Sequence, residues 1–455
     1  MSRAALHIND AGITLLDADK LLYRQPGFAL LQNDELKTGD AAVSLARINP
    51  RHVQHRFWSE LSTAGLKDQY FHHLSAADLV SHQLQAMWSA VAADIDELVV
   101  AVPPYLAAEQ LGLLLGIAAE LKLPVVGMVD AAVAATRREY RNAIPVHVDV
   151  SLHCTLLTRL AQDGAARAER SEILDGCGIY GLYDAWLTTI ARTFVEQSRF
   201  DPLHTAATEQ LLLNQLGAWL TAAGRGSTVA MEVKSGGVTH RAEIESLSLI
   251  SAAAPWYQQI ANRLRALYRA DELPVMQMTE RAGSLPGLAE MLVTHVGGEV
   301  VTLETGATAR GALARCAPDR NTNGVTLLRQ LAWDQAAIEV AVDAQAAAQS
   351  GVPTHLLFRN VAYAINDVTL LLGVEAESGA RHIELPGDMP GISRQHCKIR
   401  RKNGQCIVED SSRYGTFLNG HRIDGSTVLQ IGDSLRVGTP GFEFLLITMD
   451  EAHGT

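Results

Sequence analysis

A series of polar motifs between residues 391 and 420 constrains the fold of this chain more than any other feature. The motifs occur in a fixed order: Ser393-Arg394-Gln395-His396, then Asp410-Ser411-Ser412, Gly415-Thr416 and Asn419-Gly420. Short β-forming runs separated by turn residues surround them from Thr354 onward, a pattern typical of a β-sandwich. The sequence therefore predicts an all-β domain over residues 354–450 whose loops carry these motifs.

In order and spacing, the motifs resemble the signature of forkhead-associated (FHA) domains, small β-sandwiches that bind phosphothreonine peptides. The resemblance implies that Ser393 contacts the phosphate, that Arg394 lies beside it, and that His396 buttresses the loops. A doubly charged phosphate gains strong hydrogen bonds from hydroxyl, guanidinium and amide donors. The implied partner is a protein that carries phosphothreonine.

Two ligand-reading positions depart from the FHA pattern. Val374 stands where the family has an arginine, and Tyr414 stands where it has an asparagine. Arg413 and Arg381 are the candidate replacements for the missing charge. The candidate phosphopeptide site therefore consists of four residues: Ser393, Arg394, Arg413 and Tyr414. The alternative is that Ser393 and His396 only maintain the loop geometry.

Length and composition place the rest of the chain among soluble globular proteins. At 455 residues the chain exceeds one hydrophobic core, so two or three domains are expected. The net charge of -12 argues against nucleic acid or an anionic membrane as partner. The most apolar stretch, residues 98–135, contains charged residues, so membrane insertion is not expected. Five scattered cysteines suggest buried free thiols and a cytoplasmic location.

Residues 1–317 show alternating strand and helix patterns. A β-α-β-α pattern over residues 97–141 predicts a parallel sheet. Further strands are expected within 5–31, 145–160 and 274–278, and further helices over 184–198, 202–223, 255–270 and 286–296. Residues 318–353, with a helical pattern over 333–349, are predicted to link this domain to the sandwich.

Short motifs in residues 1–317 resemble, in order, those of the actin and DnaK-type chaperone superfamily. They are Gly39–Ala42 with Asn49-Pro50, Val102–Tyr105 with Gln110, Pro124–Val126 with Asp130–Ala135, Thr239–Glu243, Ala282–Gly287 and Thr305–Ala312. The resemblance implies an α/β, ribonuclease H-like, two-lobed ATPase fold that binds ATP or ADP with magnesium between two β-hairpins. It assigns cofactor binding to Asp10, Gly12, Asp149, Thr155, Gly283 and Ser284, with Asp10 and Asp149 positioning the magnesium.

The phosphate-binding pattern is incomplete in this sequence. The second hairpin should be glycine-rich, but Ser151, Leu152 and His153 follow Asp149-Val150. Glycines let backbone N–H groups approach a phosphate, and side chains here obstruct that approach. No lysine lies between Pro50 and Leu66, where the chaperones have their catalytic lysine. The sequence therefore predicts a pseudo-ATPase, and both nucleotide binding and the absence of any cofactor remain open.

The combination predicts a cytoplasmic scaffold or regulatory protein rather than an enzyme. The alternatives are an active ATPase that uses other residues, and an ATP-dependent filament-forming protein. The sequence Gly176–Gly181 fits the dinucleotide fingerprint G-x-G-x-x-G, but without its strand–turn–helix context it is interpreted as the turn before the helix at 184–198.

Overall fold

The chain divides into two compact units, residues 1–139 with 144–335 and residues 140–143 with 336–455. The computed structural model describes residues 2–18, 20–91, 95–140, 142–316, 325–334, 352–358, 361–375, 381–385, 391–402, 404–419, 421–431, 433–438 and 441–447. The helical pattern over 333–349 lies almost entirely outside these residues. The predicted linker begins at residue 318, whereas two strands extend the first unit through residues 327–332.

The first sheet of the first unit has the order β16-β8-β7-β1-β2-β3. Its strands are β1 (Arg3–His7), β2 (Ile13–Asp17), β3 (Lys20–Gln25), β7 (Glu97–Val102), β8 (Val125–Asp130) and β16 (Leu327–Leu328). β1, β2 and β3 are antiparallel, whereas β7 and β8 run parallel to β1. Helices α2 (Ala76–Val91) and α3 (Ala108–Glu120) pack on this sheet through one hydrophobic cluster.

The second sheet repeats this arrangement, with the order β15-β14-β9-β10-β11-β17. Its strands are β9 (Ile144–Val150), β10 (Cys154–Ala161), β11 (Ala165–Asp175), β14 (Pro274–Met278), β15 (Glu299–Thr302) and β17 (Gln330–Ala332). Again three antiparallel strands are followed by two parallel ones. The parallel pairing expected from the β-α-β-α pattern is confirmed for β7 and β8.

Two short helices, α4 (Ala131–Ala135) and α10 (Ala307–Arg315), contact each other and strands of the sheets. They are rich in alanine and share one buried cluster with residues of both sheets. A Cβ atom at Gly311 would lie 1.8 Å from the carbonyl oxygen of Ala134, so only glycine permits this approach. The predicted helix over 130–141 is shorter than expected because the backbone leaves helical geometry at Thr136.

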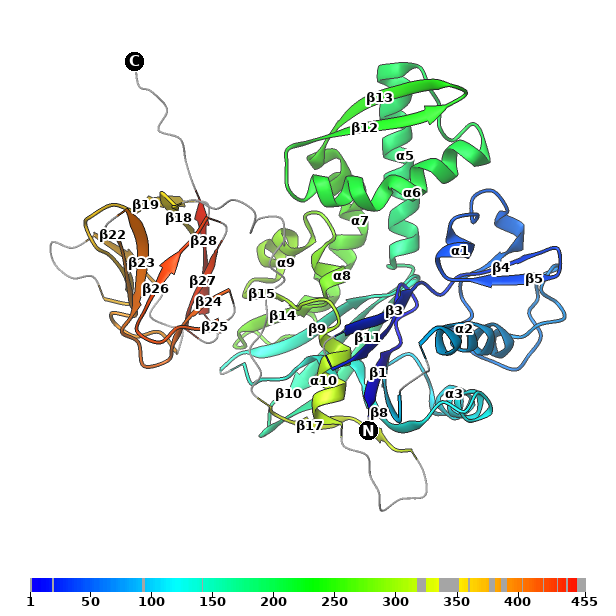
Figure 1. The fold of residues 1–455 in the computed structure, drawn as a ribbon, viewed down its shortest axis with the longest axis horizontal. Helices are drawn as coiled ribbons and strands as arrows, with labels where there is room; N and C mark the ends of the chain where they lie inside the picture. The colour runs from blue at the N-terminus through cyan, green and yellow to red at the C-terminus, as the bar shows by residue number, and fades with distance from the viewer. Residues whose placement is uncertain are drawn as a thin grey trace. The chain divides into compact units, whose positions relative to one another are not determined.

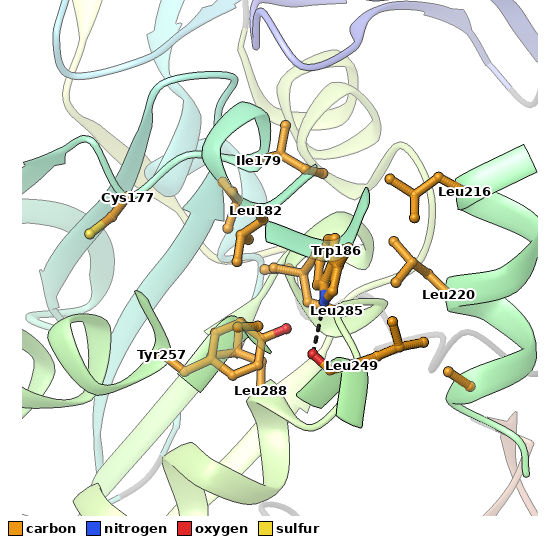
Figure 2. Close-up of a cluster of buried hydrophobic side chains, with 14 of the residues drawn as sticks. Cys177, Ile179, Leu182, Trp186, Leu216, Leu220, Leu249, Tyr257, Leu285 and Leu288 are labelled. Carbon is orange, nitrogen blue, oxygen red and sulfur yellow. Dashed lines mark hydrogen bonds between the residues drawn. The ribbon is translucent and has the colours of Figure 1, made fainter. Parts of the chain in front are cut away.

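Long helices cover the second sheet. They are α5 (Ile179–Ser198), α7 (Ser246–Arg265) and α9 (Leu288–Val296), and α6 (Ala206–Ala223) and the hairpin β12–β13 (Thr228–Ser235, Val238–Glu245) complete this part (Figure 1). The remaining elements are β4 (Ala29–Gln32), β5 (Glu35–Thr38), α1 (Asp40–Val43), η1 (Pro50–His52), β6 (Val53–Gln54) and α8 (Glu280–Gly283). Figure 2 shows the fully buried Trp186 among leucines of neighbouring helices, its Nε1 donating to the Leu249 carbonyl at 2.9 Å.

The second unit is a β-sandwich. One sheet has the order β19-β18-β28-β27-β24-β25 and the other β21-β20-β22-β23-β26. The strands are β18 (His355–Phe358), β19 (Val361–Ala364), β20 (Leu370–Gly373), β21 (Arg381–Glu384), β22 (Cys397–Lys402), β23 (Gln405–Asp410), β24 (Thr416–Leu418), β25 (His421–Arg422), β26 (Ser426–Leu429), β27 (Ser434–Gly438) and β28 (Gly441–Ile447). Apolar side chains from both sheets form one core, in agreement with the predicted sandwich.

Some predicted bounds are confirmed and one differs. Strands β7 and β14 have the predicted bounds. The helix predicted over 184–198 begins earlier, at Ile179 after the N-cap Gly178, so Tyr180 and Gly181 of the G-x-G-x-x-G stretch belong to the helix and not to a preceding turn. All five cysteines are buried free thiols. None of the helices that the structure describes is long and apolar enough to cross a membrane.

We expect the substitution Trp186→Ala to destabilise the first unit by about 3–5 kcal/mol, because it removes a large buried ring and leaves the Leu249 carbonyl without its donor. Urea unfolding of the full chain measures this effect. The matched control is Leu247→Ala on α7, where the side chain is 66% exposed and the expected change is below about 0.5 kcal/mol. Equal effects of the two substitutions would contradict the assignment of Trp186 to the core.

Candidate functional site

Three loops of the sandwich are tied together at one end of its strands. The Ser393 Oγ accepts the backbone N–H of Arg413 at 3.0 Å, which joins the loop before β22 to the loop before β24. At the end of β20, a Cβ atom on Gly373 would lie 2.0 Å from the carbonyl oxygen of Arg394. These close approaches bring Ser393, Arg394 and Arg413 to the same end of the domain.

The buried side chain of His396 fixes the positions of two of these loops by hydrogen bonds. The side chain is fully buried, its Nδ1 accepts the N–H of Ser393 at 3.1 Å, and its Nε2 lies 3.0 Å from the Gly415 carbonyl oxygen. Because Nδ1 accepts a hydrogen bond, the proton of the neutral ring must be on Nε2, which donates to Gly415. Burial lowers the pKa of His396, although Gly415 and Asp410 favour the charged form. The predicted buttressing role is confirmed.

Asp410 organises the turn that follows β23. Its Oδ1 accepts the N–H of Ser412 at 3.0 Å and the hydroxyl of Thr416 at 2.8 Å. Burial alone would raise the pKa of Asp410, but these hydrogen bonds hold the pKa below its usual value. The Ser412 Oγ then accepts the N–H of Gly415 at 2.7 Å. The motif residues of this turn thus maintain the loop and leave Ser393 and the arginines for a ligand.

Three arginines lie at this end of the sandwich. Arg394 and Arg413 are exposed, and Arg394 forms a long ion pair of 3.9 Å with Glu375. Tyr414 is 41% exposed. A third arginine, Arg422, was not predicted from the sequence. Its side chain packs against Gly415, because a Cβ atom added to that glycine would lie 2.8 Å from Arg422 Nε. The only signal for Arg422 was its place two residues after the Asn419-Gly420 motif, of which Gly420 lies outside the described residues.

Arg381, named above as a replacement for the missing charge, lies at the opposite end of the sheet, so this prediction is wrong. β21 runs parallel to β20, and Arg381 pairs with Leu370 at the beginning of both strands, whereas Glu384 pairs with Gly373 at their end. The guanidinium of Arg381 donates to the side chain of Asn366 and to the carbonyl of Ala364. It therefore holds a turn away from Ser393.

Comparison with known protein families identifies this region. The FHA domain model matches residues 378–438. The chain contains an FHA domain. FHA domains are protein-interaction modules that bind phosphopeptides, and their partners carry phosphothreonine. A search of curated proteins found no match to the chain.

In the first unit, the turns between β1 and β2 and between β9 and β10 contact each other directly. The Asp10 carboxylate accepts the backbone N–H of Leu152 at 2.7 Å, and burial raises the pKa of Asp10 to about 6. The residue that reaches Asp149 is instead Asn9, whose Nδ2 donates to Asp149 Oδ2 at 2.7 Å. Asp10 and Asp149 therefore accept hydrogen bonds from different groups.

Asp149 is buried and fully engaged by protein donors. Its Oδ1 accepts the Thr279 hydroxyl at 2.8 Å and the N–H of Val150 at 2.9 Å. His7 Nε2 lies 3.8 Å from Oδ2. Burial opposes ionisation, but the neighbouring His7 and Arg281 hold the pKa of Asp149 below its usual value. Three neutral protein donors thus stabilise this buried carboxylate.

The carboxylates at these turns do not form a ready-made magnesium site. The ion requires near-octahedral oxygen ligands, whereas Asp149 accepts three protein donors and Oδ1 of Asp10 accepts the N–H of Leu152. Within the described ranges, no group of three or more His, Cys, Asp or Glu residues could hold a metal ion. Arg281 lies against the first turn, because a Cβ atom on Gly12 would be 2.2 Å from its Nη2.

A pocket of about 410 Å³ opens beside these turns. Its lining includes residues of both turns, of α1, α5, α6 and α8: Gly12, Arg24, Phe28, Asp40, Arg47, Leu152, Ile179, Tyr180, Tyr183, Leu213, Glu280, Arg281 and Ser284. Of the predicted cofactor residues, Gly12 and Ser284 line it. Thr155 and Gly283 do not: Thr155 Oγ1 donates to the Cys177 carbonyl at 2.5 Å, and a Cβ atom on Gly283 would lie 2.4 Å from Thr302.

The side chains that replace the expected glycines make contacts of their own. His153 Nε2 lies 2.9 Å from Nδ1 of His55, and burial lowers the pKa of both rings to about 4. The Leu152–His153 turn also explains Gly178, where a Cβ atom would lie 2.3 Å from the Leu152 carbonyl oxygen. The G-x-G-x-x-G stretch therefore serves packing against this turn.

The geometry of His396 predicts a pH dependence of the second unit's stability. Because burial lowers the pKa of His396 below the unfolded value of about 6.5, the unfolded chain binds the proton more readily. The contribution of His396 to the free energy of unfolding is therefore fully present above about pH 6.5 and falls as the pH drops below that value. Urea unfolding of wild type and His396→Gln from pH 8 to about pH 5 measures the difference. If the free energy of unfolding of wild type increased on acidification relative to that of His396→Gln, the lowered pKa of His396 would be wrong.

Proposed function

We propose that this protein is a protein-interaction scaffold that binds phosphothreonine through its FHA domain and carries a first unit that does not hydrolyse ATP. The observation that carries the proposal is the set of hydrogen bonds by which His396 fixes Ser393 and Gly415. These bonds hold the loop before β22 and the loop before β24 in place before a ligand arrives, which reduces the entropic cost of binding.

The Ser393 hydroxyl is suited to a phosphate. Its oxygen accepts the N–H of Arg413, so its own proton is available to a phosphate oxygen. Arg413 and Arg422 approach the same loop and replace the arginine that the family has at the position of Val374. The phosphate would therefore receive charge-assisted hydrogen bonds from Arg413 and Arg422 rather than from an arginine at position 374.

The first unit is proposed to be a degenerate actin/DnaK-like domain. Support comes from the repeated strand order of its two sheets, in which three antiparallel strands precede two parallel ones. Loss of hydrolysis is supported by Leu152 and His153 at the second turn and by the engaged carboxylates of Asp10 and Asp149. These features favour the scaffold over an active ATPase.

We predict that a phosphothreonine peptide drawn from a library binds the full chain more tightly than its unphosphorylated form. Ser393→Ala and Arg422→Ala should each weaken binding about 10- to 150-fold, because each removes a charge-assisted hydrogen bond of about 1.5–3 kcal/mol. Fluorescence anisotropy with a labelled peptide measures these affinities.

The matched control for this experiment is Arg400→Ala, which removes an exposed arginine on β22 that pairs with Glu409 at 4.0 Å. Its affinity should equal that of wild type. If no phosphopeptide in the library bound better than its unphosphorylated twin, phosphothreonine recognition would be wrong. If Arg422→Ala bound normally while Ser393→Ala did not, the role of Arg422 would be wrong.

For the first unit, we predict no release of phosphate from ATP and magnesium above the rate in buffer, because Asp10 and Asp149 are committed to protein donors. A coupled phosphate assay on the full chain measures this rate. Turnover that is present in wild type and disappears in Asp149→Asn would show that the unit is an active ATPase.

A further inference from the structure

Two histidine rings from distant parts of the chain meet in the first unit. His55 follows β6, the strand that pairs with β4, and His153 lies in the turn between β9 and β10 of the second sheet. His55 Nδ1 lies 2.9 Å from His153 Nε2, and the ring centroids lie 4.8 Å apart. The pair therefore joins the segment after β6 to a turn of the second sheet.

The surrounding atoms decide which ring donates the hydrogen bond. His153 Nε2 also lies 3.1 Å from the backbone carbonyl oxygen of His55, which can only accept a hydrogen bond. The proton of the neutral His153 ring is therefore assigned to Nε2, and His55 Nδ1 is the acceptor. A proton added at His55 Nδ1 would place two N–H groups against each other at 2.9 Å. The contact thus requires a neutral His55.

The charged groups around the two rings oppose a positive charge on them. The cation of Arg56 acts on both rings, and that of Arg47 acts on His55. Burial and these cations lower the pKa of both rings to about 4. The carboxylates that pair with the two arginines are Asp184 and Glu209 for Arg47 and Glu60 for Arg56.

The groups packed against the pair from other elements are aromatic. The Tyr180 ring of α5 has its centroid 4.4 Å from that of His55 and 5.6 Å from that of His153, and the Phe28 ring lies 5.5 Å from His55. Burial raises the pKa of Tyr180, so its phenol is neutral at physiological pH. The ring that contacts both histidines therefore supplies no negative charge to a protonated pair.

We propose that the His55–His153 pair is an acid-sensitive contact, which holds the turn between β9 and β10 against the segment after β6 while His55 is neutral and releases the turn when His55 is protonated. Released rings have the ordinary pKa of about 6.5 and bind protons more readily than the paired rings. The contribution of the pair is therefore fully present above about pH 6.5 and is lost as the pH falls toward about 4. This inference goes beyond the proposed scaffold function, because the contact needs neither a phosphopeptide nor ATP.

Hydrogen–deuterium exchange of the full chain at pH 7.5 and pH 5.5, corrected for the intrinsic effect of pH on exchange, measures the release. The reporters are two amides that bond to the turn: Gly176 N–H donates to the His153 carbonyl, and Tyr180 N–H donates to the Leu152 carbonyl, each at 2.9 Å. In wild type, the equilibrium constant for local opening of these amides should rise about tenfold at pH 5.5 for each ring that is released. The absence of any rise would overturn the proposal.

The double variant His55→Asn/His153→Gln separates titration from contact. Asparagine places an amide oxygen near the position of Nδ1 and glutamine places an NH₂ group near that of Nε2, so a donor and an acceptor remain without a titratable ring. The opening constant of this variant should be the same at both pH values. The matched control His72→Asn/His73→Gln makes the same changes at two exposed histidines and should retain the full wild-type rise.

The decisive quantity is the ratio of the opening constants at the two pH values, so a variant that is more open at both still decides the question. A wild-type ratio in His55→Asn/His153→Gln would show that another group is the sensor and would overturn the proposal. Asp10, which accepts the N–H of Leu152, is present in every variant, so its own titration cancels in the comparison. Peptides of the FHA domain report the titration of His396 separately.

A single variant tests whether the contact holds the turn at all. His55→Leu removes the acceptor of the hydrogen bond, so the reporter amides should open at least about tenfold more often than in wild type at pH 7.5. Wild-type protection in His55→Leu at pH 7.5 would show that the pair does not hold the turn, and the proposal would be wrong.

Discussion

The charge of the buried Asp149 determines what the first unit can do. A carboxylate removed from water must find donors or a cation, and here it finds Asn9, Thr279 and the neighbouring charge of Arg281. Because these groups come from both sheets and from α8, the same contacts hold the turns together. The hydrogen bonds use lone pairs of the carboxylate that a metal ligand would need, which supports the proposal that the first unit does not hydrolyse ATP.

The buried polar side chains of the FHA domain find their hydrogen-bond partners in a different way. Its buried polar residues, His396 and Asp410, bond to backbone and hydroxyl groups of the loops rather than to each other's charges. These bonds use the motif residues as structural supports and leave the Ser393 proton and the arginines at the surface. A recognition site can survive changes at individual ligand-reading positions, such as Val374 and Tyr414, as long as the supporting bonds persist. A catalytic site has less tolerance, because its carboxylates must remain free.

The sequence predicted the architecture of the sandwich and many elements of the first unit, because apolar periodicity and turn motifs are local signals. Strands β7 and β14 were predicted at their observed bounds. Contacts between distant residues were not predictable in the same way. The sequence pattern assigned Asp10 and Asp149 a shared role at magnesium, and it gave no sign that Asn9, in the turn after β1, donates to Asp149. Arg381 was too far away for a similar reason, since parallel pairing places it at the other end of β20.

Gly12 in the first unit and Gly415 in the FHA domain share one feature, a guanidinium packed against the glycine. In each turn, a Cβ atom would collide with an arginine, at 2.2 Å from Arg281 and at 2.8 Å from Arg422. Glycine in a phosphate-binding turn ordinarily lets the backbone approach the ligand. Here the space that glycine leaves is used by a guanidinium, so the positive charge comes from a side chain rather than from backbone N–H groups or a metal. An arginine retains its charge at any physiological pH and binds phosphate in a planar, two-pronged geometry. In the FHA domain, Arg422 therefore offers a positive charge near the loop in which Tyr414 replaces the family's asparagine.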